Sequence, residues 1–221
     1  MRATTNCSSI LGKMSGFVCI PAMILGIAAL CSSANATTKG LNQIVTPDVQ
    51  PVGQLSISYQ EQDPNIGNPT ELQLELGLNK QVEIAVFQGF NPHEQIFNTE
   101  IGLVQKSNWL LSTGFSGWTS KGSDPQAYLE GGYYKGPLQT MIGAGQAGKQ
   151  TQLILGAAYQ TTPRLKLQLD YQAGSGNAAT AGFTVNITPQ LQFNPAVYVS
   201  NSSSHAVYGY AVLTWNVQLF K

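Results

Sequence analysis

The chain has 221 residues, enough for one domain and a targeting segment. Only 10% of its residues are charged, whereas a soluble domain usually has about 25%. The basic and acidic residues are equal in number, which excludes the strongly basic balance of nucleic-acid-binding proteins. Composition leaves two classes open, a β-barrel that meets lipid and a secreted β-rich protein.

Residues 1–36 are predicted to be a signal peptide that is removed. Arg2 and Lys13 give a basic start, an uncharged stretch follows over 17–30, and the tripeptide ending at Ala36 is a small-x-small cleavage signal. The uncharged stretch has 14 residues, whereas a membrane-spanning helix needs about 20. An uncleaved membrane anchor is therefore the less favoured alternative.

Cleavage after Ala36 would change the chemistry of the mature chain. All three cysteines, Cys7, Cys19 and Cys31, would leave with the signal, so no disulfide, thiolate metal site or cysteine nucleophile would remain. Nine basic residues would then stand against eleven acidic ones, a net charge of −2. No later stretch approaches the roughly 18 apolar residues of a spanning helix, so membrane insertion of the mature chain must use strands.

Residues 37–53 contain three turn-formers, Gly40, Pro47 and Pro51, and no clean hydrophobic period. We interpret them as an irregular lead-in on the periplasmic side. Residues 54–221 differ, because apolar and polar residues alternate with a period of two, which predicts half-buried strands.

Twelve strands are predicted in the 168 residues of 54–221, about 14 residues for each strand with its connection. A tilted membrane strand needs about 9–11 residues, so a closed antiparallel up-and-down barrel fits. An even strand number lets the first and last strands pair antiparallel and puts both chain ends on one side. The clear strands fall near 72–78, 82–86, 165–171, 183–187, 191–199 and 207–219, and the weaker ones near 54–61, 95–104, 109–118, 126–135, 138–146 and 151–160.

One end of the barrel is predicted to carry tight turns of three residues, because the apolar face must continue across each turn. The turn at 161–163 assumes that Gln160 opposes Arg164, and the others fall at 79–81 and 188–190. The remaining connections are rich in Gly, Pro, Asn, Asp and Ser and would be outer loops too short for a plug domain. They lie near 62–70, 88–94, 119–125, 147–150, 173–179 and 201–205.

The register between Tyr133 and Leu138 is the weakest part of this strand assignment. Their odd separation keeps them from both facing lipid under a simple register. The alternatives are a bulge at Gly136, which would reset the face, or a misassigned strand.

The strands favour a barrel in lipid over a soluble β-sandwich. The chain is a series of hairpins with no long crossover, and its polar faces are mostly uncharged. Aromatic residues also gather near strand ends, as in the interfacial girdles of outer-membrane barrels; they are Tyr59, Phe90, Phe97, Trp109, Tyr159, Tyr171 and Phe183. The residues predicted to face lipid are Leu72, Leu74, Leu76, Val82, Ile84, Leu165, Leu167, Leu169, Val185, Leu213 and Trp215.

With its signal peptide, amphipathic hairpins and aromatic terminal strand (YGYAVLTWNVQLF), the chain resembles the bacterial outer-membrane β-barrel class and is porin-like. The resemblance is architectural and covers about 54–221. It implies an outer-membrane location, contact with outer-membrane lipid, and recognition by the barrel-assembly machinery. Members of the class end on an aromatic residue that this machinery reads, whereas here Phe220 is penultimate and Lys221 is last.

The sequence predicts no catalytic residue, metal ligand set or cofactor site. A barrel hydrolase would need a serine within reach of His93 or His205, but Ser204 and His205 are neighbours on opposite faces. Two separated histidines without cysteine give no metal-ligand spacing. Gly148-Lys149 is not followed by Ser or Thr, so the phosphate-loop pattern is absent.

Charged residues opposite the apolar faces are predicted to line the lumen. A wet lumen lined by carboxylates would favour cations, whereas an internal network of salt bridges and hydrogen bonds would fill the barrel. The first reading predicts a passive channel for small polar solutes; the alternatives are a non-conducting structural or surface-interaction barrel and, less favoured, a lipid hydrolase. The lumen-lining residues are Glu75, Glu83, Glu100, Glu130, Lys166 and Asp170.

Overall fold

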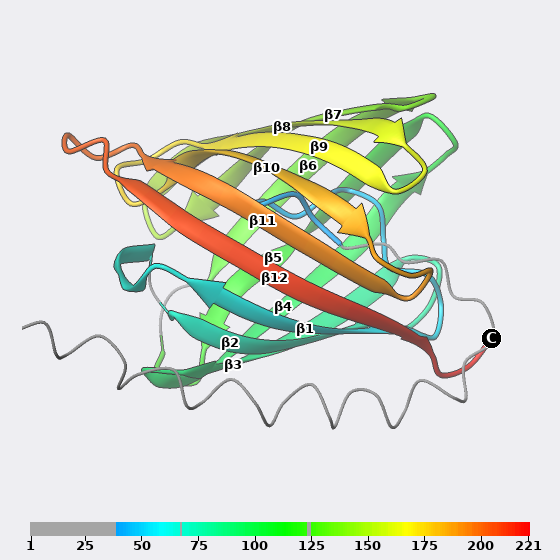
Figure 1. Cartoon of the computed structure of the whole chain (residues 1–221), viewed down its shortest axis with the longest axis horizontal. Coiled ribbons are helices and arrows are strands. Elements are labelled where there is room, and N and C mark those ends of the chain that lie inside the picture. The colour runs from blue at the N-terminus through cyan, green and yellow to red at the C-terminus, as the bar shows by residue number, and fades with distance from the viewer. Residues whose placement is uncertain (1–38, 67, 123–124) are drawn as a thin grey trace, which may run out of the picture. The chain divides into compact units, whose positions relative to one another are not determined.

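The computed structural model describes residues 39–66, 68–122 and 125–221, and these residues form a closed antiparallel barrel of twelve strands (Figure 1). Each strand pairs with its neighbours in sequence, and β12 closes on β1, with Gln54 opposite Gln218. Closure pairs the edges of the sheet that would otherwise stay open. The predicted fold class and strand number are confirmed. The described residues contain no helix long and apolar enough to cross a membrane.

The strand bounds follow the alternation in the sequence. The strands have eight to thirteen residues, close to the roughly 9–11 of a tilted membrane strand. They are β1 (Gln54–Gln62), β2 (Thr70–Gly77), β3 (Val82–Phe90), β4 (His93–Gln105), β5 (Trp109–Thr119), β6 (Gln126–Lys135), β7 (Leu138–Ala147), β8 (Gln150–Thr162), β9 (Leu165–Gln172), β10 (Ala178–Asn186), β11 (Leu191–Ser200) and β12 (Val207–Gln218), with one short 3-10 helix, η2 (Pro64–Ile66).

The barrel has two unlike ends, which we call the turn end and the loop end. The start of β1 and the end of β12 lie at the turn end, so the two chain termini of the barrel share that side, as predicted. The turn end carries the connections 78–81, 106–108, 136–137, 163–164 and 187–190, and the loop end carries 63–69, 91–92, 120–125, 148–149, 173–177 and 201–206.

Two of the three predicted turns are confirmed. The Leu78 N–H donates to the Val82 carbonyl at 2.9 Å, and the Ile187 N–H donates to the Leu191 carbonyl at 2.9 Å. The third is wrong, because Gln160 opposes Lys166 and not Arg164. A register shift between Gln160 and Thr162 takes up one residue as a bulge and leaves a shorter turn.

Tyr133 and Leu138 both face outward despite their odd separation. The two alternatives proposed for this register, a bulge at Gly136 and a misassigned strand, are both wrong. Lys135 pairs with Leu138 without a register shift, around a two-residue turn. Gly136 has a φ of +57°, a conformation that such hairpin turns require and that glycine adopts without strain. A two-residue turn pairs positions of opposite parity, so Tyr133 and Leu138 share the outer face.

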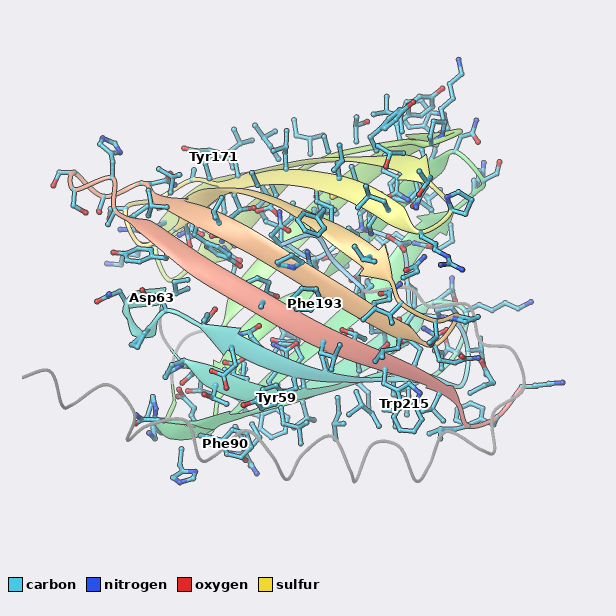
Figure 2. The ribbon with its side chains drawn as sticks, viewed as in Figure 1. Tyr59, Asp63, Phe90, Tyr171, Phe193 and Trp215 are labelled. Atoms are coloured by element: carbon cyan, nitrogen blue, oxygen red, sulfur yellow. The ribbon has the colours of Figure 1, made fainter. Side chains whose placement is uncertain are left out.

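Apolar side chains cover the outside of the barrel. Ile142 in β7 is 61% exposed and Leu169 in β9 is 59% exposed. Figure 2 places Phe90 toward the loop end and Trp215 toward the turn end. Of the eleven positions predicted to face lipid, Leu72, Leu74, Ile84, Leu167 and Leu169 are exposed, and Leu76, Val82, Leu165, Val185 and Leu213 are half-buried.

Trp215 differs from the rest of that set. It alternates with the inward-facing Thr214 and Asn216, yet it is only 8% exposed. Its register partners on the two neighbouring strands are Ile57 and Leu191. The position lies on the outward face of β12, and contact of its indole with lipid stays a prediction.

Candidate functional site

Residues 39–50, which we call the plug, lie inside the barrel. In Figure 1 this blue segment runs between the front and the back strands. Its contacts reach several walls of the lumen, with Lys39 bonded to β4, Asn42 close to β9 and β10, and Asp48 bonded to β6. Residues 37–53 were predicted to be a lead-in on the periplasmic side, whereas residues 39–50 lie in the lumen. The segment is irregular, as expected, but its polar groups find their partners in the lumen.

Lys39 anchors the plug to two carboxylates. Its Nζ lies 2.6 Å from Glu100 Oε2 and 3.2 Å from Glu83 Oε2, and it also donates to the Thr46 carbonyl at 3.0 Å. Glu83 and Glu100 oppose each other in register on β3 and β4, a placement that repels unless a cation lies between them. Burial alone would lower the pKa of Lys39, but Glu83, Glu100 and Asp48 outweigh it and raise that pKa well above its ordinary value.

Asn42 attaches the plug to the opposite wall. Its backbone N–H donates to Asp170 Oδ2 at 2.8 Å, and its side-chain amide donates to Thr180 Oγ1 at 3.0 Å. The Tyr198 hydroxyl donates to the Asn42 carbonyl at 2.6 Å. All four residues are buried, and buried polar groups that are paired in this way fix one arrangement.

Apolar side chains of the barrel wall pack against the turn of the plug. In this turn the Leu41 N–H donates to the Ile44 carbonyl at 2.9 Å. Leu41 and Ile44 pack in one buried cluster with Tyr128, Met141 and other wall residues. A Cβ at Gly156 would lie 2.8 Å from both Leu41 Cδ1 and Ile44 Cδ1. A side chain at that point of β8 would have to displace the side chains of Leu41, Ile44 and Met141.

The plug leaves the lumen at the turn end. The Tyr134 hydroxyl donates to Asp48 Oδ1 at 2.8 Å, and the Gln50 N–H donates to Glu83 Oε2 at 2.7 Å. Burial would raise the pKa of Asp48, but the charge of Lys39 and the hydroxyl of Tyr134 lower it. Glu83 is therefore shared by both ends of the plug, Lys39 and Gln50.

The predicted lumen residues all lie on the inward faces of their strands, and the plug brings several of them together. Glu83 and Glu100 bind Lys39, and Asp170 binds the backbone of Asn42. Lys166 and Asp170 do not form an ion pair, since both ion pairs of the described residues involve Lys39. Glu75 and Glu130 border the space that the plug leaves open.

That space is a cavity of about 420 Å³, which we call the vestibule. It extends from the loop end, at Ile66 and Asn177, to a floor formed by residues 39–45 of the plug. Its wall is rich in amide side chains, which join in hydrogen-bonded groups. Gln172 Nε2, for example, lies 2.8 Å from Gln152 Oε1. The vestibule is a polar chamber inside an apolar shell.

Glu130 is the least satisfied group of the vestibule. It is 0% exposed, and neither carboxylate oxygen has a hydrogen-bond partner among residues 39–66, 68–122 and 125–221. It pairs in register with Ser112 on β5 and Gly143 on β7. A buried carboxylate without a partner raises the free energy of the folded state. A proton, a water molecule or a cation at this position would stabilise it.

Neither histidine is among the described residues that line the vestibule. His93 and His205 are both exposed. Within the described part of the chain, neither imidazole has a hydrogen-bond partner. His205 has a φ of +47° in the connection between β11 and β12. No serine is brought to either ring in a nucleophilic arrangement among those residues.

The plug was not predicted from the sequence, although a signal for it was present in the strands. Small residues recur at inward positions, where a membrane barrel without filling would have no need of them. At Gly182, for instance, a Cβ would lie 2.4 Å from Asn42 Oδ1. Gly156 and Gly182 together mark the walls that the plug approaches most closely.

Comparisons with solved structures agree with the fold. The chain is similar to the KdgM porin in complex with disordered oligogalacturonate, at 11% identity, with 76% of this chain and 99% of that chain covered and a TM-score of 0.54. It is also similar to the NanC porin, at 10% identity, with 75% and 100% covered and a TM-score of 0.50. No protein-family model and no curated protein matches the chain. At these identities the likeness shows the fold, and the chain has the closed-barrel fold of outer-membrane porins.

Proposed function

We propose that the protein is a porin-like passive channel for small polar solutes in an outer membrane. The observation that carries the proposal is the vestibule, a polar cavity of about 420 Å³ inside a barrel whose outer surface is apolar. Solutes would enter at the loop end and pass the plug toward the turn end. A channel of this kind needs no catalytic group, and the exposed histidines give none.

The charges of the vestibule favour uncharged and cationic solutes. Glu71, Glu75 and Glu130 line it, whereas Lys39, the one cation among the described residues that line it, is already paired with two carboxylates. Carboxylates that line a pore select for cations. The KdgM structure holds oligogalacturonate, an acidic saccharide, and we propose that this chain differs in the charge of its solute.

Conductance in planar bilayers tests the proposal. The purified, folded protein should give small stepwise currents, and a salt gradient should give a reversal potential that favours cations. Glu75→Gln should reduce this cation preference, whereas Glu61→Gln, on the outer face of β1, should leave it unchanged. The absence of steps, or a preference for anions, would contradict the proposal.

The plug favours a second candidate, a non-conducting structural or surface-interaction barrel. Its anchors at Lys39, Asn42 and Asp48 tie it to three walls, so it could close the lumen permanently. Silence of the intact protein, together with steps from a variant without the plug, would establish this alternative.

Targeting and assembly complete the proposal. We propose cleavage after Ala36, a step that falls on residues outside those the structure describes. The turn end would then face the periplasm, the outer residues of β1–β12 would contact outer-membrane lipid, and the barrel-assembly machinery would read the terminal strand with Phe220.

A further inference from the structure

We propose that the vestibule is a binding site for a small organic cation that carries amino groups. The inference deepens the proposed function, because it assigns a solute class to the same chamber. It rests on the arrangement of three carboxylates, a pair of tyrosine rings and the floor formed by the plug.

The first wall of the site is β2, which presents Glu71 and Glu75 on one face. Glu71 is held in place by Gln73, whose Nε2 lies 3.0 Å from Glu71 Oε2, and more loosely by Gln60 at 3.4 Å. Four strand residues span about 13 Å, since each advances about 3.3 Å. The two carboxylates are therefore spaced along the chamber, which suits a ligand with more than one amino group better than a single ion.

The second wall supplies Glu130, whose oxygens lack partners within the described ranges. Lys39 also lines the vestibule, but Glu83, Glu100 and the Thr46 carbonyl already take its three donors. An ammonium group that enters the vestibule would meet an acceptor that the protein itself leaves unpaired. Glu130 borders the cavity but is 0% exposed, so an ammonium group reaches it when the side chains that cover it move.

A pair of aromatic rings provides the third component. Tyr198 and Tyr210 line the vestibule, and their ring centroids lie 5.3 Å apart at an angle of 49°. The hydroxyl of Tyr198 is bonded to the plug at Asn42, which fixes the ring. Cations are attracted to the faces of such rings, and partial desolvation in a chamber that is closed on one side strengthens that attraction.

The volume of the chamber agrees with this class of ligand. Small-molecule sites usually enclose about 300–1,000 Å³, and the vestibule encloses about 420 Å³. The plug closes the chamber on one side, so a ligand would rest on it instead of passing freely. A binding step within the channel would therefore slow and select cationic solutes.

Isothermal titration of the folded, full-length protein in detergent with spermidine tests the site. We expect saturable binding at low salt, weakened roughly tenfold by Glu75→Gln or Glu130→Gln because a partly buried charge pair is lost. Glu61→Gln removes the same charge from the outer face and should leave the affinity unchanged. Galacturonate, an anion, should show no binding in the same titration.

The outcomes separate this inference from the proposed channel. Absence of spermidine binding, or equal weakening by Glu61→Gln and Glu75→Gln, would overturn the binding site and indicate attraction to the surface charge alone. The channel would survive that result if stepwise currents are seen. Binding without any current would keep the site and remove the channel.

Discussion

Deletion of residues 39–50 from the full-length precursor should leave a folded barrel whose unit conductance is roughly tenfold larger. Twelve strands lie between the small barrels that side chains fill and the large ones that hold an open channel, so the plug decides how much of the lumen is open. The barrel should survive because its strands pair with one another around the ring. The isolated bridge between Val52 and Gly77 lies outside residues 39–50 and would remain. Single-channel recordings of both proteins in one lipid would measure the change.

A point substitution checks that the plug itself causes this effect. Gly156→Leu should displace the plug, because a side chain there meets Leu41 and Ile44. Gly209→Leu, at an exposed glycine of β12 whose Cβ would meet nothing within 4 Å, is the matched control. Equal conductance of the intact and deleted proteins, both folded by gel mobility before and after boiling, would show that residues 39–50 do not occupy the lumen.

Lys39→Met should lower the free energy of unfolding by about 3–5 kcal/mol, because one partner of a buried ionic cluster is removed. The substitution leaves Glu83 and Glu100 opposite each other without the ammonium that lies between them. Urea unfolding from lipid vesicles, followed by tryptophan fluorescence, would measure the loss. If the plug leaves the lumen instead, water reaches the carboxylates and the conductance rises.

Two variants isolate the ionic contribution. Lys80→Met removes an exposed lysine in the turn between β2 and β3 and should change the stability by no more than about 0.5 kcal/mol. Glu83→Gln and Glu100→Gln, added to Lys39→Met, should restore much of the lost stability, since the unpaired charges are removed. Lys39→Met would refute the anchor if it matched Lys80→Met in both stability and conductance.

The strands could be predicted because the alternation that defines each of them lies within its own stretch of sequence. Apolar residues such as Leu72, Leu74 and Leu76 alternate with polar ones. The apolar face of each strand must avoid water and the polar face must avoid lipid. The same pattern fixed the turns after Leu78 and Ile187. The hydrophobic pattern predicted the wrong register where the geometry of the turn, and not the position of the apolar face, sets the register. The bulge beside Gln160 and the two-residue turn at Gly136 both change parity without any change in the hydrophobic pattern.

The candidate site could be predicted only in part, because its partners are distant in sequence. The carboxylates were assigned to the lumen from alternation alone, but their ligand is Lys39, which lies 61 residues from Glu100 in the chain. The plug has no hydrophobic period, so its polarity suggested a solvated segment. The contact of its Asn42 with Asp170 depends on the closed barrel, which brings opposite walls within reach of one short segment.

Spin-label accessibility along β7 in lipid vesicles tests most directly whether the barrel lies in a membrane. Cleavage after Ala36 would leave the chain without cysteine, so a single label can be placed at Leu138, Thr140 or Ile142, or at the inward Gln139 or Met141. Labels on the outer face, where Ile142 is 61% exposed, should collide often with oxygen and rarely with a water-soluble nickel chelate, and the inward positions should not share that excess of oxygen. Equal and high access of the nickel chelate to the outer positions would mean that those side chains face water, and the membrane barrel would be contradicted.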